Sequence, residues 1–304
     1  MIKVFGHQSP DTDATGSAIV CAWYLSEHTG AAATPYVLGA LNKETEFMLE
    51  HFTTATPTLL EQVASGDDVV IVDTNNPQEL FENINDTNML SIIDHHKLVG
   101  GLETAGPIDI SMRPLASTSS VIYVLMGDIE LPEHIAGILL SCILSDTLEF
   151  RSPTTTPHNK DIAEKLAKQL GLDITTYASQ LFAAKSDISD FTDSGLIKLD
   201  SKKFAVGETN LRVSVIETTN PGTVLARKDG IVTAIKEIVA AEGDVDEVLF
   251  FVVDILNEAA TVFTYNDNVK SIIEKSFAVT VERDTEVLPG IVSRKKQILP
   301  SLKV

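Results

Sequence analysis

Four short apolar runs alternate with helical patterns through the first part of the chain. Each run is rich in β-branched residues and ends at a glycine or an aspartate, which is typical of a buried strand. We predict strands at 2–6, 35–39, 69–73 and 90–94, and helices at 15–28, 43–51, 117–126, 133–145, 158–170 and 174–185. Strands that are apolar throughout and separated by helices predict a mostly parallel, doubly wound α/β sheet.

The pattern changes near residue 186. The stretch KSDISDFTDSG (185–195) is acidic and breaks the helical spacing, which favours a linker. Beyond it we predict strands at 203–207, 211–218, 247–255 and 259–265, a helix at about 222–241, and a hairpin within 247–265 that turns at LNE. The predicted organisation is a catalytic domain at 1–186, a hinge linker at 187–194 and a smaller C-terminal α+β domain at 195–304.

Composition restricts the class of protein. Apolar residues make up 44% and charged residues 22%, as in soluble globular proteins. No apolar run is long enough for a membrane span, and the first residues lack the apolar core of a signal peptide. Cys21 and Cys142 lie in apolar segments without a CxxC pair, so we expect buried free thiols. These features predict a cytoplasmic protein without membrane contact.

The net charge excludes one class of partner. The chain has 43 acidic and 23 basic residues and a formal charge of −20. Nucleic-acid binding depends on neutralising phosphates with a basic face, so we expect no nucleic-acid partner. An anionic substrate would need positive charge from metal ions or from a few well-placed basic residues.

Acidic and imidazole side chains follow the predicted strands. In the stretch SIIDHHK the fourth strand ends in an acid, two imidazoles and a lysine in succession. The full set is His7, Asp11, Asp13, Asp73, Asp94, His95, His96 and Asp146, the last just beyond the helix at 133–145. Taken alone, the first turn is explained by Asp13 or Thr15 capping the next helix. It is not an EF-hand, because Ala22 stands where that loop requires glutamate.

Acids or imidazoles at four separate places, namely the first turn, Asp73, Asp94-His95-His96 and Asp146, together predict a metal centre. The carboxyl ends of parallel strands lie on one edge of a doubly wound sheet, where ligands bind. Carboxylates packed there repel one another unless cations separate them. Six ligands with one shared carboxylate suit two metals, and the imidazoles favour Mn²⁺ or Co²⁺ over Mg²⁺. The six predicted ligands are His7, Asp11, Asp13, Asp73, His95 and Asp146.

The sequence resembles the DHH phosphoesterase superfamily. The motifs in order are HxxxDxD (7–13), the strand-end Asp73, Asp94-His95-His96 and Ser145-Asp146. Within the superfamily the whole chain is most similar to family II inorganic pyrophosphatases. LDSKKF (199–204) resembles a basic element of that family, and SRKKQ (293–297) resembles its C-terminal signature. Residue 74 is threonine, whereas many members of the family have histidine directly after the aspartate that corresponds to Asp73.

The resemblance implies a function and a set of site residues. One metal would be held by His7, Asp11 and Asp73, and the second by Asp13, Asp73, His95 and Asp146. His96 would face the substrate, and Lys202, Arg294 and Lys295 would bind its phosphates, with Lys203 as the alternative to Lys202. The implied reaction is hydrolysis of pyrophosphate by a metal-activated bridging hydroxide, with Mg²⁺ arriving with the substrate. A homodimer through the first domain and an active site in a cleft between the domains are also implied.

Other functions have less support in the sequence. Relatives active on oligonucleotides or cyclic dinucleotides carry a glycine-rich GGGH-type element, which this chain lacks. Polyphosphate stays open as a substrate, because it requires only a longer groove. A non-catalytic sensor is disfavoured, since residues 74–90 are too few for a regulatory domain. A dinucleotide-dependent dehydrogenase is excluded because the first strand-to-helix turn lacks GxGxxG.

Overall fold

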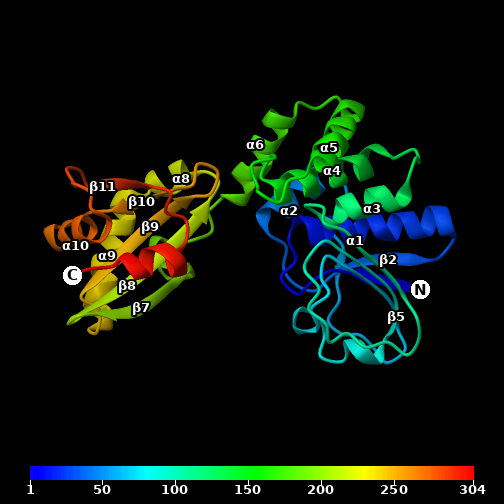
Figure 1. Ribbon diagram of the computed structural model, residues 1–304, viewed down its shortest axis with the longest axis horizontal. Helices are drawn as coiled ribbons and strands as arrows, with labels where there is room; N and C mark the ends of the chain where they lie inside the picture. The colour runs from blue at the N-terminus through cyan, green and yellow to red at the C-terminus, as the bar shows by residue number, and fades with distance from the viewer. The chain divides into compact units, whose positions relative to one another are not determined.

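The computed structural model describes residues 1–304, which form two compact units, Met1–Ala184 and Lys185–Val304 (Figure 1). None of the helices combines the length and apolar composition that crossing a lipid bilayer requires.

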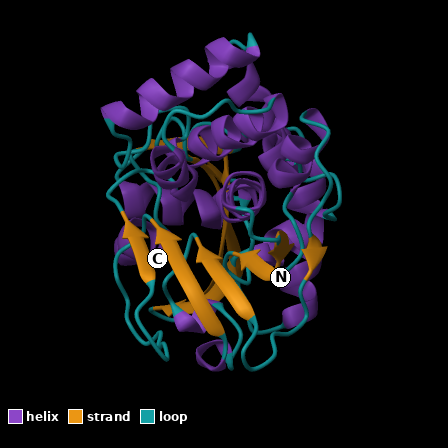
Figure 2. Ribbon diagram, turned by 90° about the vertical axis from the view of Figure 1, so that its right-hand side faces the viewer, coloured by secondary structure: helices purple, strands orange, loops and turns teal.

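The first unit is built on a six-stranded sheet in the order β3-β2-β1-β4-β5-β6. All its strand pairs are parallel (Figure 2). The strands are β1 (Ile2–Phe5), β2 (Ala33–Val37), β3 (Thr58–Leu59), β4 (Asp68–Val72), β5 (Asn88–Asp94) and β6 (Asp109–Met112). The strand order reverses between β1 and β4, which confirms the predicted doubly wound sheet. The two edge strands, β3 and β6, escaped prediction because they are too short for an alternation pattern.

The α-helices of the first unit lie on one side of this sheet (Figure 1). They are α1 (Thr12–Tyr24), α2 (Lys43–His51), α3 (Thr118–Met126), α4 (Glu133–Thr147), α5 (Pro157–Leu170) and α6 (Ile174–Lys185). A π-helical turn, η1 (Leu25–Thr29), continues α1. The opposite face is covered by irregular segments with two 3-10 turns, η2 (Pro77–Glu79) and η3 (Ile84–Asp86). There Leu80 and Ile84 pack in one buried cluster with Phe5 and Ile71.

Gly16 allows α1 to pack closely against α4. A Cβ atom at this position would overlap the Cys142 thiol and lie 2.9 Å from Ile138 Cγ2. We therefore expect Gly16→Ala to lower the unfolding free energy of the first unit by about 1–3 kcal/mol, despite the better helix propensity of alanine. Urea unfolding followed by circular dichroism measures this loss. Gly106→Ala, where an added Cβ meets nothing within 4 Å, is the control. Equal midpoints for the two variants would contradict the packing argument.

The second unit has a five-stranded mixed sheet in the order β11-β10-β9-β8-β7. The strands are β7 (Ser201–Val206), β8 (Thr209–Thr218), β9 (Glu247–Asp254), β10 (Ala259–Phe263) and β11 (Thr285–Pro289). Only β8 and β9 pair in parallel. Successive residues of β9 enter different cores: Phe250 packs with α9 (Lys228–Glu242), and Phe251 packs with α10 (Asp267–Phe277) and Ile298. The predicted α+β class and the β9–β10 hairpin are confirmed.

Some predicted elements of the second unit were wrong. The helix expected at about 222–241 is two helices, α8 (Pro221–Leu225) and α9. Between them the Arg227 guanidinium donates to Asp193 and to the carbonyls of Ile188 and Phe191. Helix α7 (Asp193–Leu199) begins inside the predicted linker, because the Thr192 hydroxyl caps it by accepting from Gly195 N. The elements α10, β11, η4 (Arg294–Ile298) and α11 (Leu299–Ser301) were also not predicted.

Candidate metal centre

The carboxyl ends of three neighbouring strands bring the titratable side chains together. His7 follows β1, Asp73 follows β4 directly, and His95 follows β5 directly. The other three predicted ligands lie on helices: Asp11 is the N-cap of α1, Asp13 lies in its first turn, and Asp146 lies on α4. This edge of the sheet includes the point where strand order reverses, which is where doubly wound sheets bind ligands.

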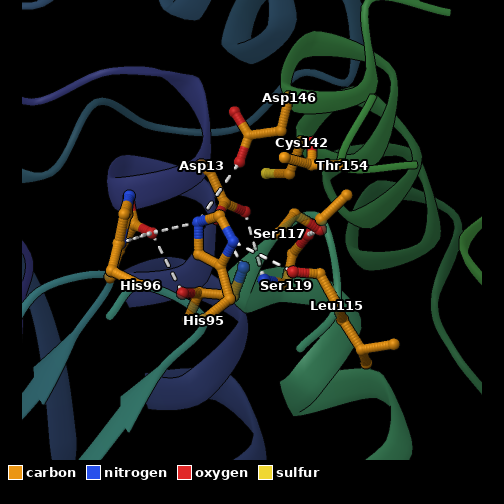
Figure 3. Close-up of polar contacts among 12 residues, drawn as sticks. Asp13, His95, His96, Leu115, Ser117, Ser119, Cys142, Asp146 and Thr154 are labelled. Atoms are coloured by element: carbon orange, nitrogen blue, oxygen red, sulfur yellow. Dashed lines mark hydrogen bonds and ion pairs between the residues drawn. The ribbon is translucent and has the colours of Figure 1, made fainter. Parts of the chain in front are cut away.

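Two predictions about the helices need correction. Asp11, and not Asp13 or Thr15, caps α1, because its carboxylate accepts from Ala14 N at 2.9 Å. Asp146 lies within the last turn of α4 and not beyond it, because α4 continues to Thr147 and ends where Leu148 turns left-handed. Figure 3 shows Asp146 pointing toward His95 and Asp13. The last turn of α4 therefore carries this carboxylate.

The six side chains form two adjoining groups. The ligand atoms of His7, Asp11 and Asp73 all lie within 4.8 Å of one another, and so do those of Asp13, His95 and Asp146. The Asp73 carboxylate lies between the groups. One of its oxygens is 3.5 Å from His7 Nε2, and the other is 3.4 Å from His95 Nε2. Asp73 is therefore the carboxylate that faces both groups of donors.

Asp73 has a left-handed backbone, with φ of 60°. Aspartate tolerates this conformation better than most residues, and such strain persists where the surrounding structure fixes it. Here the side chain is buried and accepts a hydrogen bond from the Thr118 hydroxyl at 2.9 Å. The local turn and this contact together direct the carboxylate into the cluster.

Asp13 is oriented by the N-terminus of α3. Its carboxylate oxygens accept from Thr118 N at 2.6 Å and from Ser119 N at 3.1 Å. Positive helix ends favour carboxylates, so the contact holds the buried charge in place. His95 is oriented in a similar way: its Nδ1 lies 3.1 Å from the Leu115 carbonyl (Figure 3). With its proton on Nδ1 held by this carbonyl, Nε2 is the nitrogen that faces the cluster, and it can bind a metal ion once it has lost its own proton.

The charges of the cluster are poorly balanced by the protein alone. Burial, followed by the charge of Asp73, raises the pKa of Asp13 to about 7. Burial disfavours charged His95, but the hydrogen bond to Asp73 and the charge of Asp13 outweigh it and raise its pKa to about 9. Protons on the imidazoles thus offset the crowded carboxylates. Divalent cations would do the same, and the mixture of imidazole nitrogen and carboxylate oxygen fits Mn²⁺ or Co²⁺.

His96 is held beside the cluster through Asp94. Its Nδ1 lies 2.9 Å from Asp94 Oδ1, and its side chain remains 53% exposed. This hydrogen bond, more than any other effect, raises the pKa of His96. Asn75 fixes the same loop from the other side: its amide donates to Asp94 and to the Lys97 carbonyl, and it accepts from Val99 N. His96 is therefore positioned firmly but open to a ligand.

A cavity of about 500 Å³ opens beside the cluster within the first unit. Nearly all of its lining residues have polar side chains, among them His7, Asp73, Thr74, Glu79 and His96. Thr74, at the position where many members of the resembled family have histidine, donates its hydroxyl to Glu79 at 2.6 Å. Glu79 also adds negative charge that helps to raise the pKa of His7. The departure at Thr74 therefore changes the surroundings of the cluster and removes no candidate ligand.

The predicted phosphate-binding residues lie in the second unit. Arg294 donates from Nη1 to the Asp200 carbonyl at 2.9 Å and pairs with its carboxylate at 2.7 Å. Lys203 pairs instead with Asp244 at 2.7 Å and with Glu242 at 3.3 Å. Lys202 precedes it on β7, so its side chain leaves the opposite face of the strand. Lys295 is exposed.

Sequence reasoning missed two supporting residues. Thr118 contacts Asp73, and Asn75 contacts Asp94. Neither is an acid or a histidine, so neither was singled out as a candidate site residue. The only local signal for Thr118 is the hydroxyl-rich run Ser117–Ser120 before an apolar helix, which predicts a helix N-terminus.

Family models and known proteins match the chain over its length. Residues 1–143 match the DHH family, N-terminal domain, and residues 179–304 match the DHHA2 domain. A protein of Lactobacillus acidophilus, named as a probable manganese-dependent inorganic pyrophosphatase, is 36% identical over 98% of this chain and 96% of its own length. A Streptococcus agalactiae protein of the same name is 34% identical over 99% and 97%.

Solved structures agree with these matches. A Methanococcus jannaschii protein assigned to family II inorganic pyrophosphatase is 35% identical, with a TM-score of 0.64, and the match covers 99% of this chain and 98% of that one. An exopolyphosphatase-related protein from Bacteroides fragilis, 16% identical with a TM-score of 0.50, shares the fold. With two domain models in order and relatives aligned from end to end, this chain belongs to the family II, manganese-dependent inorganic pyrophosphatases.

Proposed function

We propose that this protein hydrolyses inorganic pyrophosphate to two orthophosphates at a centre of two Mn²⁺ ions. The observation that supports this most directly is the Asp73 carboxylate, which lies between two groups of nitrogen and oxygen donors. Relatives over the whole chain carry the name of that activity. Co²⁺ suits the same donors, and we propose that an additional Mg²⁺ arrives with the substrate.

The proposed ligand sets follow the two groups. His7, Asp11 and Asp73 hold one ion, and Asp13, Asp73, His95 and Asp146 hold the other. Bound dications lower the pKa of a water molecule and so supply a hydroxide nucleophile at neutral pH. The surrounding residues support these roles: α3 fixes Asp13, the Leu115 carbonyl orients His95, and Thr118 orients Asp73.

His96 is the proposed substrate contact of the first unit. Asp94 fixes the imidazole through Nδ1, which leaves Nε2 to meet a phosphate oxygen. Because the same hydrogen bond favours protonated His96, the imidazolium donates to the leaving-group side of the substrate. A donor placed where negative charge develops lowers the barrier to hydrolysis.

The proposed phosphate-binding residues of the second unit are Lys202, Arg294 and Lys295. Arginine offers a planar fork for bidentate phosphate contact, and lysine adds a compact charge. The alternation along β7 supports Lys202 over Lys203. Phe204 lies on the same face of β7 as Lys202, and it packs against a cluster that contains Ile298. Ile298 belongs to η4, the element that begins with Arg294. Lys203 is already paired with α9 and the residues after it.

Further parts of the proposal concern assembly and motion. We propose that residues 187–194 act as a hinge between a catalytic domain at 1–186 and a substrate-binding domain at 195–304, and that the protein is cytoplasmic. We also propose a homodimer formed through the first unit. Strand β6 is a sheet edge, and the exposed apolar residues Leu98, Val99 and Ile110 lie on it or on the loop before it. Sedimentation equilibrium tests this, and a monomer at micromolar concentration contradicts it.

Phosphate release from three substrates tests the function. We expect rapid release from pyrophosphate with Mn²⁺, at least about tenfold slower release from tripolyphosphate, and none from a dinucleotide, which needs base-stacking surfaces. Removing the metal with a chelator should abolish turnover, and Mn²⁺ should restore it. A preference for tripolyphosphate would indicate a polyphosphatase instead. Full activity in the chelated protein would contradict the metal centre.

A further inference from the structure

Glu44 is a buried carboxylate outside the ligand set that joins three helices. It lies in the first turn of α2, and no part of its side chain is exposed. Its Oε2 accepts from the Thr12 hydroxyl of α1 at 3.0 Å and from the Ser145 hydroxyl of α4 at 2.8 Å. The Asn42 side chain caps α2 by accepting from Thr45 N and Thr45 Oγ1, which fixes the turn that carries Glu44.

The two donors to Glu44 are immediate neighbours of candidate ligands. Thr12 stands between Asp11 and Asp13, and Ser145 precedes Asp146. The Thr12 carbonyl also accepts from the Cys142 thiol of α4 at 3.2 Å, so α1 and α4 are joined at two points just beneath the cluster. Asp13 and Asp146 belong to the same group of donors. The distance between these two carboxylates therefore depends on how α1 and α4 are held together.

We propose that Glu44 is a positioning residue, which sets the spacing of Asp13 and Asp146 for the second metal ion without touching metal or substrate. This inference rests on the proposed function. A charged acceptor forms stronger hydrogen bonds than a neutral one, and burial increases their strength further. Groups that hold metal ligands in place typically change metal affinity by 10–100-fold when they are altered.

Direct Mn²⁺ binding by Glu44→Gln tests the proposal. Glutamine has nearly the same shape but removes the charge from the acceptor. We expect the metal-free variant to bind one Mn²⁺ with unchanged affinity and the other about 10–100-fold more weakly. Calorimetry, and loss of the free-Mn²⁺ electron paramagnetic resonance signal, measure both affinities without turnover. Activity should recover at saturating Mn²⁺, with an unchanged KM for pyrophosphate. Glu46→Gln, at an exposed position of the same helix, is the matched control.

The outcomes separate this proposal from the function on which it rests. If the unaltered protein binds no Mn²⁺, the proposed function fails. If it binds two ions and Glu44→Gln binds both within twofold of the same affinity, only the role of Glu44 fails. A lower melting temperature with unchanged affinities would likewise reduce Glu44 to a packing role. If Glu44→Gln does not fold, Ser145→Ala and Thr12→Val remove the donors singly, and unchanged Mn²⁺ binding in both would overturn the proposal.

Discussion

Replacing Asp73 by asparagine should abolish pyrophosphate hydrolysis while the protein remains folded. The Asp73 carboxylate faces both donor groups, so its charge is the one that both proposed ions share. Metal-ion catalysis supplies several kcal/mol of barrier lowering, so we expect kcat/KM to fall by about 10³-fold or more. Steady-state phosphate release with saturating Mn²⁺ measures this loss.

Asparagine is the informative substitution at this position. Like aspartate, it tolerates the left-handed backbone at residue 73, whereas alanine would add strain. Its side-chain oxygen can still accept from the Thr118 hydroxyl, so the fold should persist, as circular dichroism can verify. Asp86→Asn removes an equal charge at an exposed position and should leave turnover unchanged. A near-normal kcat/KM in the Asp73→Asn enzyme would contradict the proposal that two metal ions share this carboxylate.

Arg294→Ala should weaken substrate capture by about 10²-fold in kcat/KM, the usual cost of removing one donor to developing negative charge. In the structure Arg294 Nη1 contacts both the carbonyl and the carboxylate of Asp200, which limits the side-chain entropy lost on binding phosphate. Lysine cannot reproduce a bidentate contact, so Arg294→Lys should rescue only part of the loss. Initial rates at low pyrophosphate concentration measure kcat/KM directly.

The two lysines of β7 provide a matched comparison. Lys202→Ala should lower kcat/KM by at least about tenfold, because a lost phosphate contact costs 1.4 kcal/mol or more. Lys203→Ala should leave turnover unchanged, since that side chain lies on the opposite face of β7 from Lys202 and is paired there with Asp244 and Glu242. It should instead cost a little stability. The reverse pattern would show that the paired lysine is the one that meets substrate.

Local patterns were sufficient for many of the elements and for the residue types of the site. The apolar runs that end in Asp73 and Asp94-His95 are visible in the sequence, because a buried parallel strand must be apolar and must stop where polar groups begin. Helices 43–51 and 174–185 were predicted with the boundaries that the structure shows. Short edge strands and the early start of α1 were missed, because they depend on a neighbouring strand or on one cap.

The sequence by itself determined that acids and imidazoles stand at the ends of strands, and the family resemblance assigned them to metals. Only the tertiary structure decided how they are held. Asp13 meets the N-terminus of α3 across 105 residues of chain, and Glu44 meets Ser145 across 101. Lys202 and Lys203 are adjacent in sequence, yet strand alternation sends them to opposite faces. Such contacts depend on strand order and helix packing, which bring distant segments together and leave no periodic signal in either segment.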